Sequence, residues 1–237
     1  SPALEEHLEA LPVGDAWLHT SPEFALKRAL ALGLPRIFSI TPCYRAEEWG
    51  PLHATEFTML EWYRAGVGYR GVMEDCEALV RAAAATVGRE LGPFVHLTVE
   101  EAFAGDRPND PIEQQRRWIN DIEQTLVEPT FVRDYPASEA AFSSLRGPIA
   151  ERFELYWQGI ELGNAFTELL DGDELLQRWG ASNTARLHEG RAPYPVDERL
   201  VQAVRQHPYC GGMAMGVDRL VMLLLGLSDI REVRLEG

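Results

Sequence analysis

A carboxylate interrupts an apolar face in residues 56–64, whose sequence is EFTMLEWYR. The odd positions of this segment are Phe57, Met59, Glu61 and Tyr63. Alternate residues of a β-strand share a face, so these four side chains line up if the segment is a strand. A buried carboxylate without a partner is costly, so Glu61 requires a cationic ligand or an internal Arg unless the strand is half exposed. At about 3.3 Å per residue, Phe57 and Tyr63 lie roughly 20 Å apart, comparable to a nucleotide joined to an amino acid.

An arginine precedes the loop that leads into this segment. Arg45 lies near the end of residues 36–48, which read as the preceding strand. Antiparallel pairing is expected to place Arg45 beside the middle of residues 56–64. There its planar fork would suit a phosphate or a carboxylate. The alternative is a surface salt bridge with the acidic residues that follow it.

Two glutamates flank a small-residue pair in GIELGNAFTELL, residues 159–170. Glu161 and Glu168 are seven positions apart, so a flat strand would direct them to opposite faces. A kink at Gly163–Asn164 would bring both carboxylates to one side. Paired carboxylates near nucleotide phosphates suit Mg²⁺, which prefers oxygen ligands. The alternative is two solvated carboxylates at a sheet edge.

A nearly bare strand face is expected in GGMAMGVDRL, residues 211–220. Gly212, Ala214 and Gly216 would share this face, and a flat ligand could lie against it. Arg219, at the start of the following helix, could fold back over such a ligand. Close strand–helix packing is the competing explanation for the glycines. The sequence contains no P-loop, nucleophile-elbow or HExxH motif.

The elements that must position these residues mix strands and helices without βαβ regularity. A helix is expected within residues 20–33, with Ser21 as its cap, Pro22 and Glu23 in its first turn and Gly33 at its end. Further helical patterns occupy residues 71–89, 113–127, 171–179, 194–206 and the stretch that ends at Gly226. This mixture predicts an α+β fold with a mainly antiparallel sheet flanked by helices.

Composition limits the function classes. The chain has 237 residues, a formal net charge of −15 and an apolar fraction of 46%. The acidic balance disfavours broad nucleic-acid binding. No apolar run reaches the roughly 18 to 20 residues of a membrane span. Three widely spaced cysteines fit neither a disulfide framework nor a zinc site, so a reducing cytoplasm is the expected location.

Together these motifs resemble those of class II aminoacyl-tRNA synthetases, from Thr20 to Leu225. YRAEE followed by H..EFTMLEWYR is similar to motif 2 of that family, and GGMAMGVDRLVMLLLG is similar to motif 3. TSPEFALKR and GIELGNAFTELLDGDELLQRW resemble the lysyl-tRNA synthetase branch. Ala214 falls where the stand-alone paralogues of that branch, the elongation factor P–(R)-β-lysine ligases, carry Ala and true lysyl-tRNA synthetases carry Gly.

The resemblance implies an organisation for the chain. Residues 1–237 would form a single class II catalytic domain, with no segment long enough to encode an anticodon-binding domain. Motif 1, which builds the family's dimer interface, would lie before Ser1. A homodimer is therefore allowed but not required, and tRNA is not expected as the acceptor.

The resemblance also implies a reaction and its residues. ATP and Mg²⁺ would convert lysine or (R)-β-lysine to an aminoacyl-adenylate, and the residue would pass to a lysine of elongation factor P. The central catalytic roles would fall to Arg45, Arg219 and Glu161, with metal binding by Glu161 and Glu168. The ATP site would comprise Arg45, Glu47, His53, Phe57, Glu161, Leu162, Gly216 and Arg219. The amino-acid site would comprise Ser21, Pro22, Glu23, Glu61, Tyr63, Asn164, Glu168 and Ala214.

Two positions depart from the family pattern. Ala46 and Ala54 stand where most relatives carry Asn, whose side chain contacts ATP or fixes the motif 2 loop. Two alternatives therefore remain beside the main hypothesis. One is amino-acid activation for another acceptor, such as a carrier protein, a small molecule or a tRNA. The other is a catalytically silent paralogue that regulates by binding.

Overall fold

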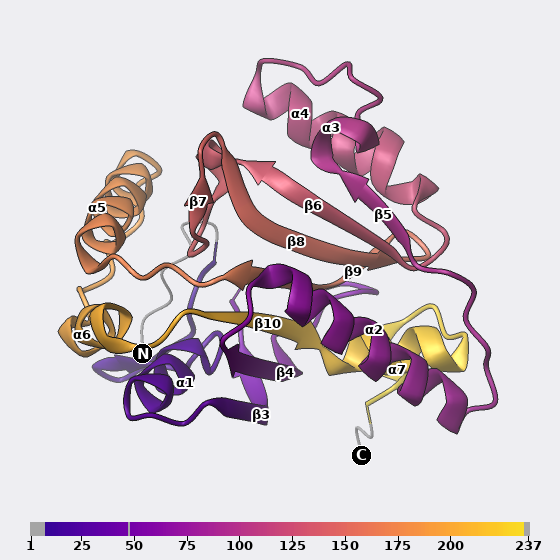
Figure 1. Cartoon of the computed structure of the whole chain (residues 1–237), viewed down its shortest axis with the longest axis horizontal. Helices are drawn as coiled ribbons and strands as arrows, with labels where there is room; N and C mark the ends of the chain where they lie inside the picture. Colours follow the sequence, from indigo (N-terminus) through magenta and orange to yellow (C-terminus); the bar gives the residue numbers. More distant parts are fainter. Residues whose placement is uncertain (1–7, 47, 235–237) are drawn as a thin grey trace.

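A long, mainly antiparallel sheet organises the chain (Figure 1). The computed structural model describes residues 8–46 and 48–234. In these residues the neighbouring strands run in the order β3-β4-β10-β9-β8-β6-β5, and β7 pairs with β8. The strands are β3 Arg36–Tyr44, β4 Glu56–Ala65, β5 Val95–Thr98, β6 Thr130–Pro136, β7 Leu145–Arg146, β8 Ile149–Trp157, β9 Ile160–Thr167 and β10 Cys210–Gly216. The β5–β6 pair is parallel, and the α+β prediction is confirmed.

Helices gather at three places around this sheet. They are α1 Glu23–Ala31, α2 Tyr69–Thr86, α3 Val99–Ala102, α4 Pro111–Arg117, α5 Gly172–His188, α6 Glu198–Gln206 and α7 Val217–Leu225. In Figure 1, α1, α5 and α6 lie at one end, α2 and α7 lie together at the other, and α3 and α4 sit above β5 and β6. A small separate hairpin pairs β1, Pro12–Val13, with β2, Ala16–Trp17. No helix in the described part of the chain combines the length and apolar character that a membrane crossing requires.

Helix α1 is bounded by a proline at its beginning and a left-handed glycine after its end. It begins one residue later than its capping pattern suggests, because Pro22 occupies the N-cap position. Ser21 still accepts a hydrogen bond from the Glu23 N–H at 3.2 Å. The helix ends at Ala31, and Gly33 follows with a φ of +93°, a left-handed conformation that glycine adopts without steric cost.

The β3–β4 hairpin sets the position of the arginine before the loop. Tyr44 pairs with Glu56, and the Arg45 N–H donates to the Thr55 carbonyl at 2.9 Å. Ser39, not Arg45, therefore lies opposite Glu61. The expectation that Arg45 sits beside the middle of β4 is wrong, because β3 ends at Tyr44 and leaves Arg45 level with the beginning of β4.

A two-residue turn joins β8 to β9. The turn is at Gln158–Gly159, both with positive φ, as a type I′ hairpin turn requires. The strand β9 continues through Gly163–Asn164, so no strand ends there, but the expected kink is present one residue earlier, at Leu162. The pairing does shift register beside it: Leu155 faces Gly163, whereas Tyr156 faces Glu161. This irregularity inserts one extra residue into β9, as a β-bulge does, and reverses the alternation of side chains before Gly163.

The sheet has one face covered by helices and one that holds a cavity. Met213 and Met215 of β10 belong to the main hydrophobic core, together with residues of α2 and α7. A Cβ on Gly211 would meet Val72 of α2 at 2.5 Å, so that glycine permits close helix–sheet packing. The next residue along the strand, Gly212, faces the opposite side, toward Tyr63.

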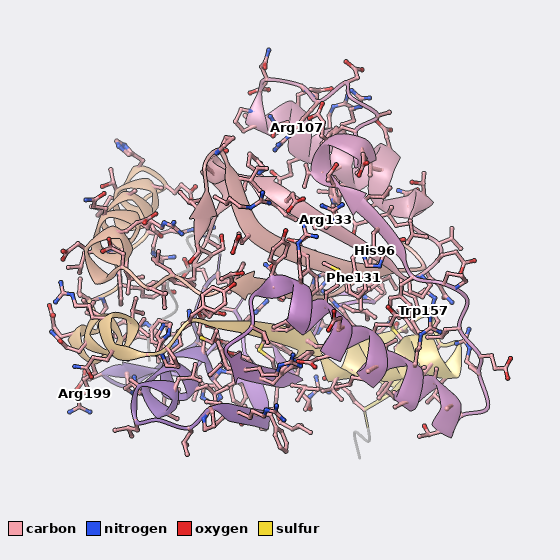
Figure 2. The ribbon with its side chains drawn as sticks, in the orientation of Figure 1. His96, Arg107, Phe131, Arg133, Trp157 and Arg199 are labelled. Carbon is pink, nitrogen blue, oxygen red and sulfur yellow. The ribbon has the colours of Figure 1, made fainter. Side chains whose placement is uncertain are left out.

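Aromatic side chains pack against one another at the part of the sheet farthest from β3. Figure 2 labels His96 and Phe131 on the neighbouring strands β5 and β6, and their ring centroids lie 5.2 Å apart. Phe131 also contacts Phe94 and Phe153. The helical pattern predicted for residues 113–127 divides into α4, a π-helical turn at Trp118–Ile122 and a short 3₁₀ turn.

Cys43, Cys76 and Cys210 are free and buried.

Candidate active site

A cavity of about 330 Å³ lies against β4, β9 and β10. Its floor comes from these three strands, and its walls come from α1, α7 and the loop between β3 and β4. Among the residues predicted to form a site, those that line it are Ser21, Glu23, Arg45, His53, Phe57, Glu61, Tyr63, Glu161, Leu162, Asn164, Glu168, Ala214, Gly216 and Arg219. Pro22 adjoins the cavity without lining it, and Glu47 falls outside the described residues.

One end of the cavity carries buried acids. Glu61 is 2% exposed, and the Tyr63 hydroxyl donates to its Oε1 at 2.6 Å. Its Oε2 is also buried and has no hydrogen-bond partner in the described part of the molecule. Burial raises the pKa of Glu61 well above its usual range, and the nearby Glu23 carboxylate raises it further. The carboxyl thus lacks the partner that its position in the strand requires.

A lysine that the sequence analysis did not select lies among these acids. Lys27 is 2% exposed, and its Nζ lies 2.5 Å from Glu23 Oε1 and 2.7 Å from Glu168 Oε2. Burial works to lower the pKa of Lys27, but the two carboxylates outweigh it and raise that pKa. The i,i+4 spacing of Glu23 and Lys27 on a helix is a sequence signal that would have identified this pair, but it was not used.

Glu168 belongs to the acidic end rather than to the neighbourhood of Glu161. It follows the last residue of β9, and its carboxylate engages Lys27. Burial raises the pKa of Glu168 to about 7 even though Lys27 opposes the shift. Its ordinary pKa is near 4.3, so the charged form is destabilised by its surroundings and would gain from a second cation.

Arginines occupy the opposite end. The Arg219 Nε donates to the Leu52 carbonyl at 3.0 Å, and its Nη1 donates to the Glu161 carbonyl at 2.9 Å. The Arg45 guanidinium lies over the Phe57 ring, with 5.1 Å to the ring centroid. His53 is nearby, and its pKa is lowered by burial and then by Arg219, so it is neutral near pH 7. This end is suited to anionic groups.

A second pair of carboxylates lies between the two ends. Glu161 is accompanied by Glu154 of β8, which also lines the cavity and which the sequence analysis missed. Burial, and then Glu154, raise the pKa of Glu161 to about 7. Glu154 accepts hydrogen bonds from the Tyr135 and Tyr156 hydroxyls at 2.7 and 2.6 Å, and it pairs with Arg152. In the described residues no cluster of three or more His, Cys, Asp or Glu side chains is arranged to hold a metal.

The strand β10 supplies a nearly bare surface between these groups. A Cβ on Gly212 would lie 2.4 Å from the Tyr63 ring and 2.7 Å from Glu168 Oε1, so only glycine fits there. A Cβ on Gly216 would meet its nearest neighbours at 3.9 Å, so this position is open. Ala214 pairs with Glu61 on one side and with Asn164 on the other. The Asn164 Oδ1 accepts a hydrogen bond from Arg152 Nε at 3.2 Å.

Comparison with known proteins identifies close sequence relatives. Residues 7–235 match the family model described as tRNA synthetases class II (D, K and N). The elongation factor P–(R)-β-lysine ligases of Vibrio cholerae and Vibrio atlanticus are each 35% identical to this chain. The alignments cover 91% and 90% of this chain, and 76% and 75% of those proteins. The protein of that name from Photobacterium profundum is also 35% identical, over 92% of this chain and 76% of its own length.

Proposed function

Because the chain belongs to the class II tRNA synthetases of the D, K and N group, we propose that it activates a lysine-type amino acid with ATP and transfers it to a lysine of elongation factor P. Its relatives' names supply the acceptor and the (R)-β-lysine substrate. The described residues form one eight-stranded sheet with its helices and a small separate hairpin, which supports a single catalytic domain. The cytoplasm, where translation factors act, is the corresponding location.

One observation carries this proposal: acids and guanidinium groups occupy opposite ends of the same cavity. Glu61 Oε2 is buried without a partner, which an ammonium group of the substrate would supply. Arg45 and Arg219 provide the planar, multiply donating groups that phosphates and carboxylates require. A diamino acid joined to a nucleotide has this distribution of charge.

The family resemblance suggests how the cavity residues divide these tasks. Phe57 and Arg219 would enclose the adenine, and base–aromatic stacking is worth about 1–3 kcal/mol. Arg45 would bridge the amino-acid carboxylate and the α-phosphate, and Asn164 would orient that carboxylate. The residues that would contact ATP are Glu47, His53, Leu162 and Gly216. Glu23 would bind the α-amine, with Ser21 and Pro22 beside it. The distal amine would be bound by Glu61, Tyr63 and Glu168, next to Ala214.

The proposed reaction needs little proton transfer from the protein. The amino-acid carboxylate attacks the α-phosphorus in line, the bond to the bridging oxygen breaks, and pyrophosphate leaves. An amine of the acceptor protein then attacks the carbonyl carbon of the adenylate, loses a proton and releases AMP. Arg45 and Arg219 act by holding the reactants in line and by stabilising the charge that develops on the phosphate oxygens.

A divalent cation fits beside Glu161, although with a different partner from the one that the sequence suggested. Mg²⁺ commonly takes one or two protein carboxylates and completes its shell with substrate phosphates and water. Glu154 is the carboxylate close enough to Glu161 to raise its pKa, whereas Glu168 lies with Lys27 at the other end of the cavity. We therefore assign the cation to Glu161 and Glu154. When bound, Mg²⁺ would neutralise phosphate charge.

The test is ATP–pyrophosphate exchange with α-lysine and with (R)-β-lysine, followed by transfer to purified elongation factor P. Exchange and transfer with either amino acid are expected for the unmodified protein. Arg219→Gln should reduce exchange by about 10² or more, because a guanidinium aimed at developing charge is lost. Arg116→Gln is the matched control, since Arg116 is an exposed residue of α4 that pairs with Glu113.

Two outcomes would contradict the proposal. Exchange without transfer to elongation factor P would point to another acceptor. Absence of both exchange and ATP binding would indicate a catalytically silent relative.

A further inference from the structure

Lys27 brings a permanent positive charge into the part of the cavity that the proposed function reserves for a cationic substrate. Its Nζ contacts the carboxylates of Glu23 and Glu168, and lies 4.8 Å from the centroid of the Phe142 ring. Lys27 is 2% exposed, so this ammonium group is removed from solvent. The ionisable groups that face it are Glu23 of α1, Glu61 and Tyr63 of β4, Glu168 after β9, His207 after α6 and Cys210 of β10.

The charges of this cluster cancel only if its acids take up protons or if a ligand supplies cations, because burial raises the pKa of Glu61 and of Glu168. Three carboxylates, from Glu23, Glu61 and Glu168, face one ammonium group from Lys27. Fully ionised, the set has a surplus of two negative charges. Uncompensated charge is costly to bury, whereas a balanced and hydrogen-bonded set is tolerated. A substrate with two ammonium groups would balance it.

We propose that Lys27 determines substrate specificity as a positioning residue, by cancelling one of the three carboxylates so that the remaining charge matches an amino acid with two amines. This inference rests on the proposed function. Lys27 contacts two of the three acids and thereby holds Glu23 and Glu168 at a fixed separation. The third acid, Glu61, keeps its free Oε2 for the ligand. An amino acid with one amine would leave one carboxylate unpaired and would be rejected.

The protonation behaviour of the cluster is consistent with this role. Glu168 titrates near pH 7 while Lys27 holds its pKa down. Without that ammonium group the pKa of Glu168 would be higher still, and the acid would be protonated at neutral pH. A protonated carboxyl cannot balance a substrate ammonium group. Substrate binding would then require loss of a proton.

The experiment compares Lys27→Met with the unmodified protein in ATP–pyrophosphate exchange between pH 6.5 and 8.5. At pH 7 the KM for lysine should rise about tenfold, and the KM for ATP should change less than about twofold. The acid limb of kcat/KM for lysine should move upward by about one pH unit, because Glu168 loses the cation that favours its ionised form. Lys27→Arg keeps the charge and should restore both the lower KM and the original pH profile.

Arg28→Gln is the matched control, since it removes a positive charge from the next position of the same helix. Arg28 pairs with Asp197 at 3.3 Å and does not line the cavity. This variant should leave the KM for lysine and the pH profile unchanged. A residue that merely stabilised α1 would alter both KM values together and would not move the pH profile.

The inference fails if Lys27→Met keeps the lysine KM and pH profile of the unmodified protein, or if both KM values rise equally. Should Lys27→Met not fold, Lys27→Arg decides: loss of lysine binding with the charge retained would overturn the inference. If the unmodified protein shows no exchange with any lysine-type amino acid, the proposed function itself fails. Exchange by the unmodified protein with no effect of Lys27 overturns the role of Lys27 alone.

Discussion

Burial destabilises the ionised form of Glu168, and a cationic substrate would stabilise that form. It is 1% exposed, and Lys27 is its ion-pair partner at 2.7 Å. Burial raises the pKa of its carboxyl to about 7, so part of the population is protonated at neutral pH. A substrate ammonium group would favour the ionised form, and this gain is part of the binding free energy of a diamino acid.

Glu168→Gln should therefore weaken amino-acid binding selectively. The amide keeps the shape of the side chain and removes its charge, so the KM for lysine should rise about thirtyfold or more, the cost of leaving a buried charge short of its partner. The KM for ATP should stay within about twofold, because the arginines lie at the opposite end of the cavity. Steady-state exchange kinetics would measure both constants, and equal changes in the two would contradict the assignment of this pocket.

Glu174→Gln provides the comparison for that variant. Glu174 lies in the first turn of α5, pairs with Arg178 and does not line the cavity. Loss of this partly exposed ion pair should change stability by less than about 1 kcal/mol and leave both KM values unaltered.

Single residues were predictable where local spacing expressed their role. Glu61 stood out because strand alternation set a carboxylate among apolar neighbours, and it is buried without a second partner. Glu154 gave no such signal, since its relation to Glu161 depends on the pairing of β8 with β9. Lys27 was not predicted; its i,i+4 spacing from Glu23 is a local signal, but its contact with Glu168 joins residues 141 positions apart. A local sequence pattern does not show which distant segments pair, so contacts of this kind were not predicted.

At the scale of elements, the neighbouring strands β9 and β10 each contain a glycine, and the two glycines serve different purposes. A Cβ at Gly163 of β9 would lie 2.3 Å from the carbonyl oxygen of Ala214, a backbone atom that cannot yield. At Gly216, in contrast, the nearest atoms would be 3.9 Å away, and the φ of −73° suits any residue. The first glycine is required by strand packing, and the second borders the cavity beside Arg219.

Alanine substitutions at these two glycines should therefore have different effects. Gly163→Ala should cost about 1–3 kcal/mol of folding free energy through overpacking, which corresponds to a fall in Tm of roughly 3 °C or more. Gly216→Ala should leave the Tm within about 1 °C and raise the KM for ATP several-fold, because its methyl group enters the space proposed for adenosine. Thermal unfolding and exchange kinetics on both variants test this, and an unstable Gly216→Ala would contradict it.

Helices and strands were predicted well where nearby residues determine them, and less well where pairing with another strand determines them. The strand β4 and the helix α7 follow their sequence patterns, the latter ending at Gly226 with a φ of +70°. The kink expected at Gly163–Asn164 lies one residue earlier, where the pairing with β8 shifts register. The turn between β8 and β9 was not predicted, because Gln158 adopts a positive φ there, which few non-glycine residues do and which no local pattern indicated.

At the scale of the molecule, the cavity joins segments that are far apart in the sequence. Its residues come from α1, β4, β8, β9, β10 and α7, and Figure 1 shows the strands side by side, with α1 toward one end and α7 toward the other. A ligand that contacts all of them binds the folded state and not the unfolded chain. Binding should therefore raise the stability of the whole domain.

Lysine and ATP together should raise the Tm by more than either alone. At a concentration about 100 times the dissociation constant, one ligand contributes about 2.7 kcal/mol. For a chain of this size that is roughly 5–10 °C. In Lys27→Met the shift caused by lysine should shrink while the shift caused by ATP remains, because the two ligands occupy opposite ends of one cavity. Differential scanning calorimetry of both proteins measures these shifts, and a variant that lost both equally would show that the two ends do not bind separately.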